Sequence, residues 1–433
     1  MVKLSIIGAG SFFTEKLVID ILNIEGLDDG EIALVDVDAK RLEMARKLTE
    51  RAVQLMGKRF KVTASVNRRE VISGSRFVIN QIEVAGLRTV RNEFEIPLKY
   101  GVKQCIGDTM GPGGLFKILR TVPAWLDILK DIEELCPEAL ILNYTNPMSA
   151  VTLSTVKAAN IPVVGLCHSI QHTSRQLADY LEVPYEELKW RAGGINHMSW
   201  FVELSRDGRD LYPELKERAE KPEFLAKDPV RLDFMKYGGA FVSESSGHFS
   251  EYLPYYRKRQ ELIDRHCGER YLGETGFYAN NWPEWRRKSD EAIFNKVEGK
   301  EEMSLTSSHE YAAVIIEAIL KHEPKVIYGN VLNRSLIENL PTDGIVEVAC
   351  LVDRNGVQPA VFGRLPEHLA ALCRSNMAFF DLAVDAVLKN SREMAYHALL
   401  IDPLTAAVCS PFEIKSMFDE LYEADKPYIP NLK

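Results

Sequence analysis

Two segments of this sequence combine a thiol with imidazole groups. Cys167 and His168 stand in GLCHSIQ (165–171), and His197 stands in GGINHMSW (193–200). A thiolate and an imidazole from separate segments can hold a borderline divalent metal such as Mn²⁺, Fe²⁺, Co²⁺ or Ni²⁺, with open positions for substrate oxygens. Two protein ligands are too few for a closed structural zinc site. The spacing alone is also typical of two unrelated core residues, and the glycines before His197 predict a bent loop.

Three further segments carry polar groups that could act on a ligand. They are GDTMGPGG (107–114), NYTNPMS (143–149) and SESSGHFSEYLPYY (243–256). The first predicts a loop before a helix, and turn chemistry explains the second equally well. Aromatic packing is the ordinary explanation of the third, yet so many hydroxyl and imidazole groups would be costly to bury without partners.

The elements that must position these groups alternate through the first 170 residues. Short apolar runs cover 3–8, 31–36, 60–65, 76–81, 139–144 and 161–166. Amphipathic stretches with helical spacing, such as 38–55 and 116–135, lie between them. This alternation predicts a doubly wound parallel sheet, whose carboxyl edge binds ligands.

A tight glycine turn follows the first apolar run. Gly8, Gly10 and Ser11 precede a helix that should begin near Phe13, which stands where the third glycine of a full dinucleotide motif would be. The free N–H groups of such a helix start can hold a pyrophosphate. Asp36 ends the second run, where a carboxylate binds an adenine ribose and repels a 2′-phosphate, so the pattern favours NAD over NADP. The alternative is that Asp36 only caps the next helix.

The strand and helix rhythm is lost after about residue 170. We expect an α/β protein in which a Rossmann-like doubly wound domain (1–170) is followed by a mixed α+β domain (171–433), arranged as in lactate and malate dehydrogenases. The second domain should carry substrate, metal and oligomer contacts. No Gly/Pro/Ser-rich linker separates the halves, so they should share an interface where a site could lie.

Bulk composition excludes several classes of protein. The net charge is -9, from 53 basic and 62 acidic residues without a basic stripe, so nucleic acid is not an expected partner. No apolar stretch approaches the roughly 20 residues of a membrane span, and the first residues resemble a strand rather than a signal peptide. Seven widely spaced cysteines indicate a reducing compartment, and we expect a cytoplasmic protein.

The segments together resemble glycoside hydrolase family 4 along essentially the whole chain. The segments that carry the resemblance are IGAGS (7–11), DTMGPGG (108–114), NYTNPM (143–148), GLCHS (165–169), GINHM (194–198), ESSGHFSEYLP (244–254) and IYGNVLN (327–333). The CHS form at 167–169, with ESSGHFSEY downstream, is most similar to the α-galactosidase (melibiase) branch. Members that act on 6-phosphorylated sugars generally carry an acidic residue or asparagine after the cysteine.

The resemblance implies an α-galactosidase that hydrolyses small unphosphorylated α-galactosides with NAD and Mn²⁺ or another divalent transition metal. NAD removes hydride from C3, the metal stabilises the enediolate, the group at C1 is eliminated, water adds and the hydride returns, with retention of configuration. This scheme is an exception to the usual pair of carboxylates. Homodimers or homotetramers are expected from the same resemblance.

The resemblance also assigns roles to residues. Cys167 and His197 would bind the metal, and Tyr252, with its pKa lowered by the metal charge, would take the C2 proton. His168 is the first choice for the leaving-group acid and Asp108 the second. Asn146 and His197 would also contact the sugar. The residues expected to contact NAD are Gly8, Gly10, Ser11, Phe12, Asp36, Glu83 and Asn146.

Three alternatives stay open. An α-galacturonidase, α-glucosidase or α-glucuronidase would keep the fold and the mechanism and change the sugar. A simple NAD-dependent hydroxy-acid dehydrogenase could use the same nucleotide fold. An NAD-binding sensor without enzymatic activity would leave the thiol, imidazole and polar segments without a purpose.

Overall fold

The structure is a computed structural model that describes residues 1–308 and 310–433. The strands are β1 (Val2–Ile7), β2 (Asp29–Val35), β3 (Arg59–Ser65), β4 (Phe77–Asn80), β5 (Leu140–Asn143), β6 (Val163–Gly165), β7 (Lys189–Ile195), β8 (Met198–Arg206), β9 (Arg209–Asp210), β10 (Phe241–Val242), β11 (Lys325–Leu332), β12 (Ile345–Asp353) and β13 (Gly356–Pro359). The helices are α1 (Phe13–Leu22), α2 (Ala39–Leu55), α3 (Val90–Lys99), α4 (Gly111–Leu135), α5 (Met148–Ala158), α6 (Ser169–Leu181), α7 (Tyr212–Ala219), α8 (Pro222–Leu225), α9 (Pro229–Gly238), α10 (Ser246–Glu251), α11 (Gln260–His266), α12 (Phe277–Val297), α13 (Tyr311–Lys321), α14 (Glu367–Leu388), α15 (Arg392–Leu400), α16 (Pro403–Val408) and α17 (Pro411–Asp425).

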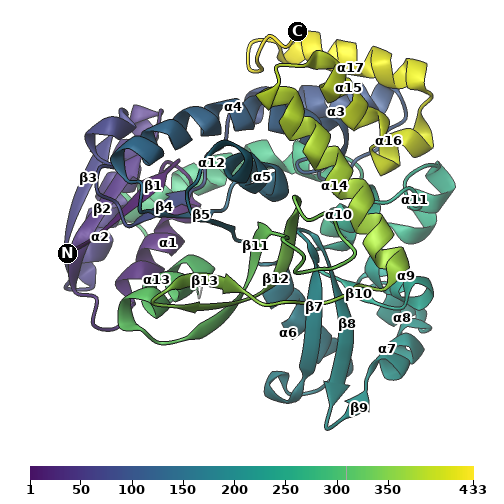
Figure 1. The fold of residues 1–433 in the computed structure, drawn as a ribbon, viewed down its shortest axis with the longest axis horizontal. Helices are drawn as coiled ribbons and strands as arrows, with labels where there is room; N and C mark the ends of the chain where they lie inside the picture. Colours follow the sequence, from purple (N-terminus) through teal and green to yellow (C-terminus); the bar gives the residue numbers. More distant parts are fainter. Residues whose placement is uncertain (309) are drawn as a thin grey trace.

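The first part of the chain forms a parallel sheet in the order β3-β2-β1-β4-β5-β6 (Figure 1). The register places Ile7 of β1 beside Val35 of β2 and Asn80 of β4. This is the strand order of a Rossmann fold, and helices cover both faces, so the central strands can be apolar throughout. Every apolar run predicted in this region is a strand, which confirms the predicted doubly wound sheet.

The loop predicted over 107–114 is shorter than expected, because helix α4 already begins at Gly111. Glycines make this possible. A β-carbon on Gly113 would lie 2.1 Å from the carbonyl oxygen of Gly107, and one on Gly114 would lie 2.3 Å from the carbonyl carbon of Thr109. The helix start and the preceding loop are therefore packed against each other at van der Waals limits.

The same sheet continues into the second part of the chain with antiparallel strands. β11 joins β6 through the pair Asn330 and Gly165, and β12 joins β7 through the pair Glu347 and Gly194. The bent loop predicted before His197 is wrong: its glycines belong to β7 of the β7–β8 hairpin. The cause is close packing, since a β-carbon on Gly194 would lie 2.4 Å from the carbonyl oxygen of Met198. The proposed division at residue 170 stays a prediction.

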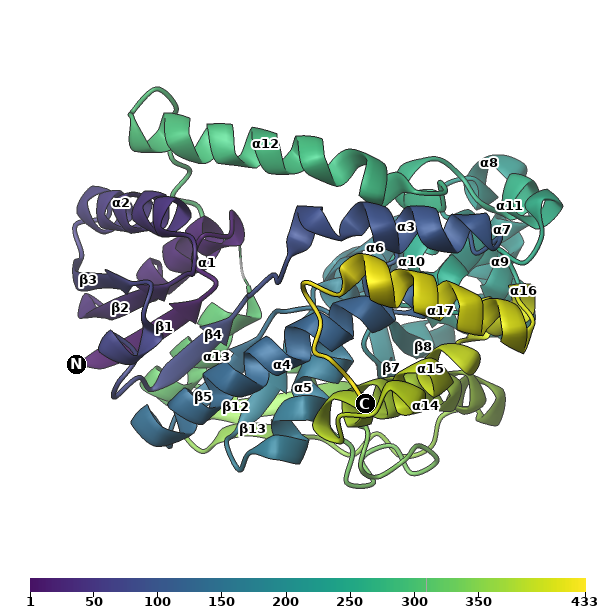
Figure 2. The ribbon, with the colours of Figure 1, turned by 90° about the horizontal axis from the view of Figure 1, so that it is seen from above.

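Long helices complete the second part. The C-terminal helices α14 to α17 gather with α3 and α4 at one side of the sheet (Figure 1). Helix α12 spans the top of the view in Figure 2, from α2 past α3 toward the segment around α11. Within the described residues, no helix has both the length and the apolar character needed to cross a bilayer.

Candidate active site

The glycine turn after β1 is built on close backbone contacts. Gly8 has φ +84°, and a β-carbon there would lie 2.7 Å from the carbonyl oxygen of Gln81. The backbone N–H of Gly10 donates to Asp36 Oδ2 at 2.7 Å. A β-carbon on Gly10 would lie 2.8 Å from that same oxygen. A side chain at either position would clash with its neighbours, so both positions require glycine. The absence of side chains also lets a ligand approach the backbone of the turn.

Asp36 does not cap helix α2. That role belongs to Asp38, which accepts hydrogen bonds from the backbone N–H groups of Lys40 and Arg41. Asp36 instead joins the glycine turn to the end of β2, since its Oδ1 also accepts from the backbone N–H of Asp38 at 2.9 Å. Each carboxylate oxygen has a second lone pair that a ribose hydroxyl could use.

The glycine turn opens into a cavity of about 310 Å³ that reaches the end of β6. Helix α12 contributes Tyr278, Trp282 and Arg286 to its lining. The predicted site residues that share this cavity are Ser11, Phe12, Glu83, Asp108, Asn146, Cys167 and His168. The tertiary structure thus brings part of the candidate nucleotide site, both candidate acids and one candidate metal ligand, Cys167, to one cleft at the carboxyl edge of the sheet.

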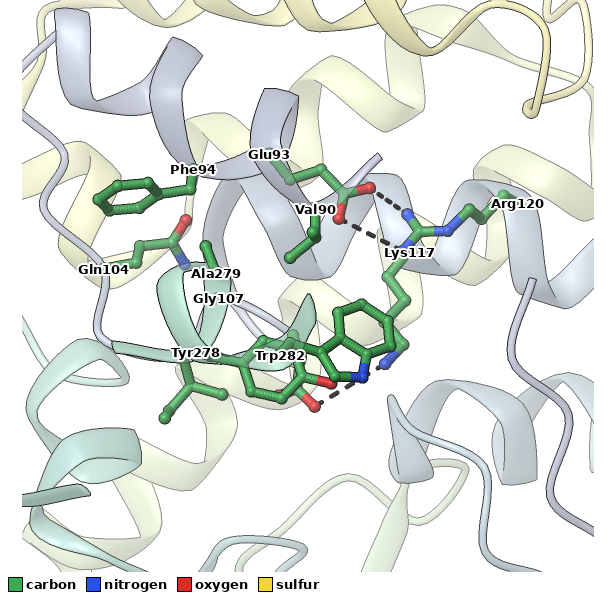
Figure 3. Close-up of a pocket in the computed structure, with 12 residues that line it drawn as sticks. Val90, Glu93, Phe94, Gln104, Gly107, Lys117, Arg120, Tyr278, Ala279 and Trp282 are labelled. Carbon is green, nitrogen blue, oxygen red and sulfur yellow. Dashed lines mark hydrogen bonds and ion pairs between the residues drawn. The ribbon is translucent and has the colours of Figure 1, made fainter. Parts of the chain in front are cut away.

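A buried lysine that sequence analysis missed connects two of these residues. Lys117 Nζ lies 2.9 Å from Glu83 Oε2 and 3.8 Å from Asp108 Oδ2. Burial alone lowers the pKa of Lys117, but the two carboxylates outweigh it and raise the pKa. Lys117 also lines an adjoining pocket, in which Glu93 and Arg120 form an ion pair (Figure 3). The sequence signal that could have identified Lys117 is its position as a charged residue within the apolar stretch at the start of α4.

The metal candidates meet beside the cleft, and Cys167 is the one that lines it. A thiol, an imidazole and a carboxylate, from Cys167, His197 and Glu244, have ligand atoms within 4.8 Å of one another. His197 and Glu244 both have positive φ, +62° and +70°, a conformation that is rare for side-chain-bearing residues and clusters at functional sites. This donor set fits a borderline transition metal with open coordination positions. The sequence motifs predicted two ligands, Cys167 and His197, and did not identify Glu244 as a third.

The charges of the cluster favour a cation. Burial alone raises the pKa of Glu244, but His248, His197 and Arg231 outweigh it and lower the pKa, so this carboxylate is ionised. Burial lowers the pKa of His197, while Glu244, Cys167 and Asp108 outweigh that effect and raise it to about 10. A cation would replace the proton that these anions now hold on the imidazole.

Tyr252 lies directly behind His197. Its hydroxyl is 3.0 Å from Nδ1 of His197, whose Nε2 lies 3.6 Å from Glu244 Oε2. The phenol is 2% exposed. Burial, together with Asp108 and Glu251, raises the pKa of Tyr252 well above its ordinary value of 10. In the protein alone, the pKa of Tyr252 is therefore shifted upward, opposite to the lowering that a metal charge would cause.

Asp108 is held in place from two sides. Its Oδ1 accepts a hydrogen bond from Thr109 Oγ1 at 2.8 Å and lies 3.9 Å from His248 Nε2. The loop before it is fixed by the buried Glu251, which accepts from the backbone N–H groups of Cys105, Ile106 and Gly107. Burial raises the pKa of Asp108, but the nearby cations, Lys117 first, outweigh it and lower the pKa. Asp108 is therefore ionised at neutral pH.

His168 stands at the start of helix α6, with its Nε2 against the buried carboxylate of Glu310. Its side chain is 40% exposed and faces the rings of Phe13 and Tyr144. An imidazole that is open to the cleft and paired with a carboxylate can carry and release a proton.

Comparison with known proteins agrees with this architecture. An α-galactosidase from Bacillus subtilis (strain 168) is 39% identical over 440 residues, which cover 100% of both chains. The structure of a 6-phospho-α-glucosidase from gut microorganisms, in complex with NAD and Mn²⁺, is similar with a TM-score of 0.84 at 20% identity over 100% of both chains. Malate dehydrogenase from Plasmodium falciparum is similar with a TM-score of 0.53 at 14% identity, over 92% of this chain and 100% of that one. The last two likenesses concern the fold alone, and they confirm the predicted dehydrogenase-like arrangement.

Two family models cover most of the chain. The model described as Family 4 glycosyl hydrolase matches residues 3–183, and the model described as Family 4 glycosyl hydrolase C-terminal domain matches residues 192–405. With the full-length relative, these matches confirm the resemblance drawn from the sequence: the chain belongs to family 4 of the glycosyl hydrolases.

Proposed function

We propose that this protein is an α-galactosidase that acts on small unphosphorylated α-galactosides with NAD and a divalent metal, Mn²⁺ or a similar ion. One observation carries the proposal: Cys167 lines the cleft that begins at the glycine turn and also lies within ligand distance of His197 and Glu244. A nucleotide on the turn and a cation on the thiolate would therefore share one substrate-sized space. The α-galactosidase relative at 39% identity supports the choice of sugar.

The cofactors would supply the redox and Lewis-acid chemistry: NAD would take hydride from C3 of the sugar, and the cation would stabilise negative charge on O2 and O3. Gly8, Gly10, Ser11, Phe12, Asp36, Glu83 and Asn146 would hold the nucleotide. Asn146, which lines the cleft, would also contact the sugar.

Tyr252 would accept the acidified proton at C2, and its contact with His197 supports this role. If the Nε2 that faces Glu244 binds a cation as a neutral imidazole, the proton of His197 resides on Nδ1. Nδ1–H then donates to the oxygen of Tyr252 across the 3.0 Å contact. A phenolate that accepts this hydrogen bond is stabilised, which offsets the cost of burial.

His168 is the proposed acid for the leaving group. Its ring lines the cleft, and its Nε2 contacts the carboxylate of Glu310, which would hold the imidazole in one orientation. Asp108, the second choice, is less suited, because Lys117 keeps its carboxylate ionised and an acid must arrive protonated. Asp108 instead offers a fixed negative charge beside His248.

The charges near the cleft support a neutral sugar over a galacturonide. Among the described residues that line the cavity, the lysine and arginine side chains are Lys117 and Arg286. Lys117 is already paired with Glu83. Arg286 lies in the field of Asp290, Glu83 and Asp36, toward the nucleotide end. A C6 carboxylate would therefore have to compete with Glu83 for Lys117 or reach Arg286 at the nucleotide end of the cavity.

The test is a substrate panel. Purified protein with NAD⁺, Mn²⁺ and a thiol reductant should hydrolyse nitrophenyl α-galactoside faster than the corresponding α-galacturonide, α-glucoside and α-glucuronide, and NADH should not accumulate. If the galacturonide is hydrolysed fastest, the proposed substrate is wrong and the proposed mechanism stands. Net formation of NADH with a hydroxy acid, and no glycoside cleavage, would make the protein a dehydrogenase. Absence of any turnover would favour a sensor.

The same proposal includes a setting for the protein. We expect a homodimer or homotetramer in the cytoplasm, with small glycosides as its ligands and neither nucleic acid nor membrane as a partner. Metal binding through Cys167 would require a reducing environment, because oxidation of its sulfur would remove the ligand.

A further inference from the structure

A buried polar cluster lies where the parallel and antiparallel halves of the sheet join. Its members are Glu347 of β12, Asn330 of β11 and Ser199 of β8, each 0% exposed. Ser199 Oγ donates to Glu347 Oε2 at 2.6 Å, and Asn330 Nδ2 donates to Glu347 Oε1 at 3.2 Å. One carboxylate therefore connects three strands through two hydrogen bonds.

Each neighbour of Glu347 also reaches a segment that carries a proposed metal ligand. Asn330 Nδ2 donates to the carbonyl oxygen of Gly165, shortly before Cys167, at 3.3 Å. Ser199 Oγ lies 3.2 Å from the carbonyl oxygen of Ile195, shortly before His197.

Ser199 reaches the third ligand segment as well. Its backbone N–H donates to Ser243 Oγ at 3.1 Å, and its carbonyl oxygen accepts from the backbone N–H of Ser243 at 2.7 Å. Ser243 immediately precedes Glu244. The cluster thus touches the chain beside all three proposed ligands, although these ligands are far apart in the sequence.

Stability alone does not explain this arrangement. A buried carboxyl group is costly, and apolar side chains of similar volume usually fill such a position at least as well. Within the described part of the chain, Asn330 Oδ1 has no hydrogen-bond partner, which adds a further cost. Hydrogen-bond networks around metal ligands are retained despite such costs, because they orient the ligands.

We infer that Glu347 is a positioning residue, which, through Asn330 and Ser199, sets the separation of Cys167, His197 and Glu244 for cation binding. This inference rests on the proposed metal site. It assigns a purpose to the segment IYGNVLN (327–333), which the proposed chemistry does not otherwise use.

The test compares Glu347→Gln and Ser199→Ala with matched controls on β8, Glu203→Gln and Ser205→Ala. Titration of each protein with Mn²⁺ alone, followed by electron paramagnetic resonance, measures the affinity for the cation. NAD binding and thermal unfolding are measured on the same samples. The absorption spectrum of bound Co²⁺ reports ligand geometry, which general destabilisation would not alter in a folded sample.

Glu347→Gln should weaken Mn²⁺ binding about tenfold or more, because Gln presents an N–H to one of the two donors. Ser199→Ala should weaken it several-fold, and the double variant should lose less than the product of the two effects. Both should change the Co²⁺ spectrum and retain NAD binding, while the controls behave as wild type. If Glu347→Gln does not fold, the milder Ser199→Ala variant tests the positioning role by the same measurements.

Cys167→Ser separates the possible failures. If Cys167→Ser binds Mn²⁺ as tightly as wild type, the proposed metal site itself is wrong. If Cys167→Ser loses Mn²⁺ while Glu347→Gln and Ser199→Ala remain within about twofold of wild type with unchanged Co²⁺ spectra, the site stands and the positioning role of Glu347 is overturned.

Discussion

The glycine turn and the metal cluster meet at one cleft, but they are assembled differently. Gly8 and Gly10 directly follow β1, Asp36 directly follows the neighbouring β2, and the backbone N–H of Gly10 donates to the Asp36 carboxylate. Cys167, His197 and Glu244 are side chains on three separate segments that the joined sheet brings together. The turn is assembled within the first half of the chain, from the ends of β1, β2 and β4, whereas the cluster exists only when both halves of the chain are packed.

The two regions should therefore fail independently, and the metal side should give the largest loss. Cys167→Ser should reduce glycoside hydrolysis on the order of 10³-fold, because Lewis-acid stabilisation contributes several kcal/mol. NAD affinity should remain that of wild type. Steady-state assays with saturating Mn²⁺ and fluorescence titration with NAD⁺ measure the two effects. Cys136→Ala, at a buried cysteine of the core, is the control, and equal loss in both variants would deny Cys167 a special role.

Loss of the proposed base, Tyr252, should give the next largest effect. Tyr252→Phe should lower exchange of the C2 proton of the sugar with D₂O about 10²-fold or more, since the ring remains but no oxygen can accept the proton. Nuclear magnetic resonance of the sugar follows the exchange, and Mn²⁺ affinity serves as the control for the intact site. Exchange at the normal rate would remove Tyr252 from this role.

A substitution in the glycine turn should affect NAD binding and leave the metal site intact. Gly8→Ala should weaken NAD binding about tenfold or more, because the new β-carbon would lie 2.7 Å from the Gln81 carbonyl oxygen and φ is +84°. Mn²⁺ binding should change little. Gly26→Ala, at another positive φ with open space around it, controls for backbone strain alone. Parallel loss of both cofactors would contradict the independence of the two regions.

The smallest effect should appear at the contact between the regions. Lys117 lowers the pKa of Asp108 against the effect of burial. Its replacement in Lys117→Met should raise that pKa, so protonation of Asp108 begins at higher pH. The acid limb of the kcat/KM profile should then move up by about one pH unit. Lys117→Arg keeps the charge and should restore the wild-type limb; an unmoved limb in Lys117→Met would show that ionised Asp108 is not needed.

The parallel sheet and the nucleotide turn could be predicted from the sequence because their signals are local. Apolar runs of strand length and glycines directly after the first strand depend on residues close in the chain. Boundaries were less accurate where glycines allow close packing, as at Gly111 in α4 and Gly194 in β7. The family motifs brought Cys167 and His197 together as a resemblance, not as a consequence of their spacing.

By itself, the sequence determined the Rossmann-like half, the family and the main candidate residues. Only the tertiary structure decided that Glu244 lies with Cys167 and His197, that Lys117 links Glu83 with Asp108, and that Glu347 contacts Ser199 and Asn330 beside the candidate ligands. The physical reason is that these side chains act through distances of a few ångströms between distant segments. Those distances arise when β11 and β12 pair with β6 and β7, a pairing that no local pattern of residues specifies.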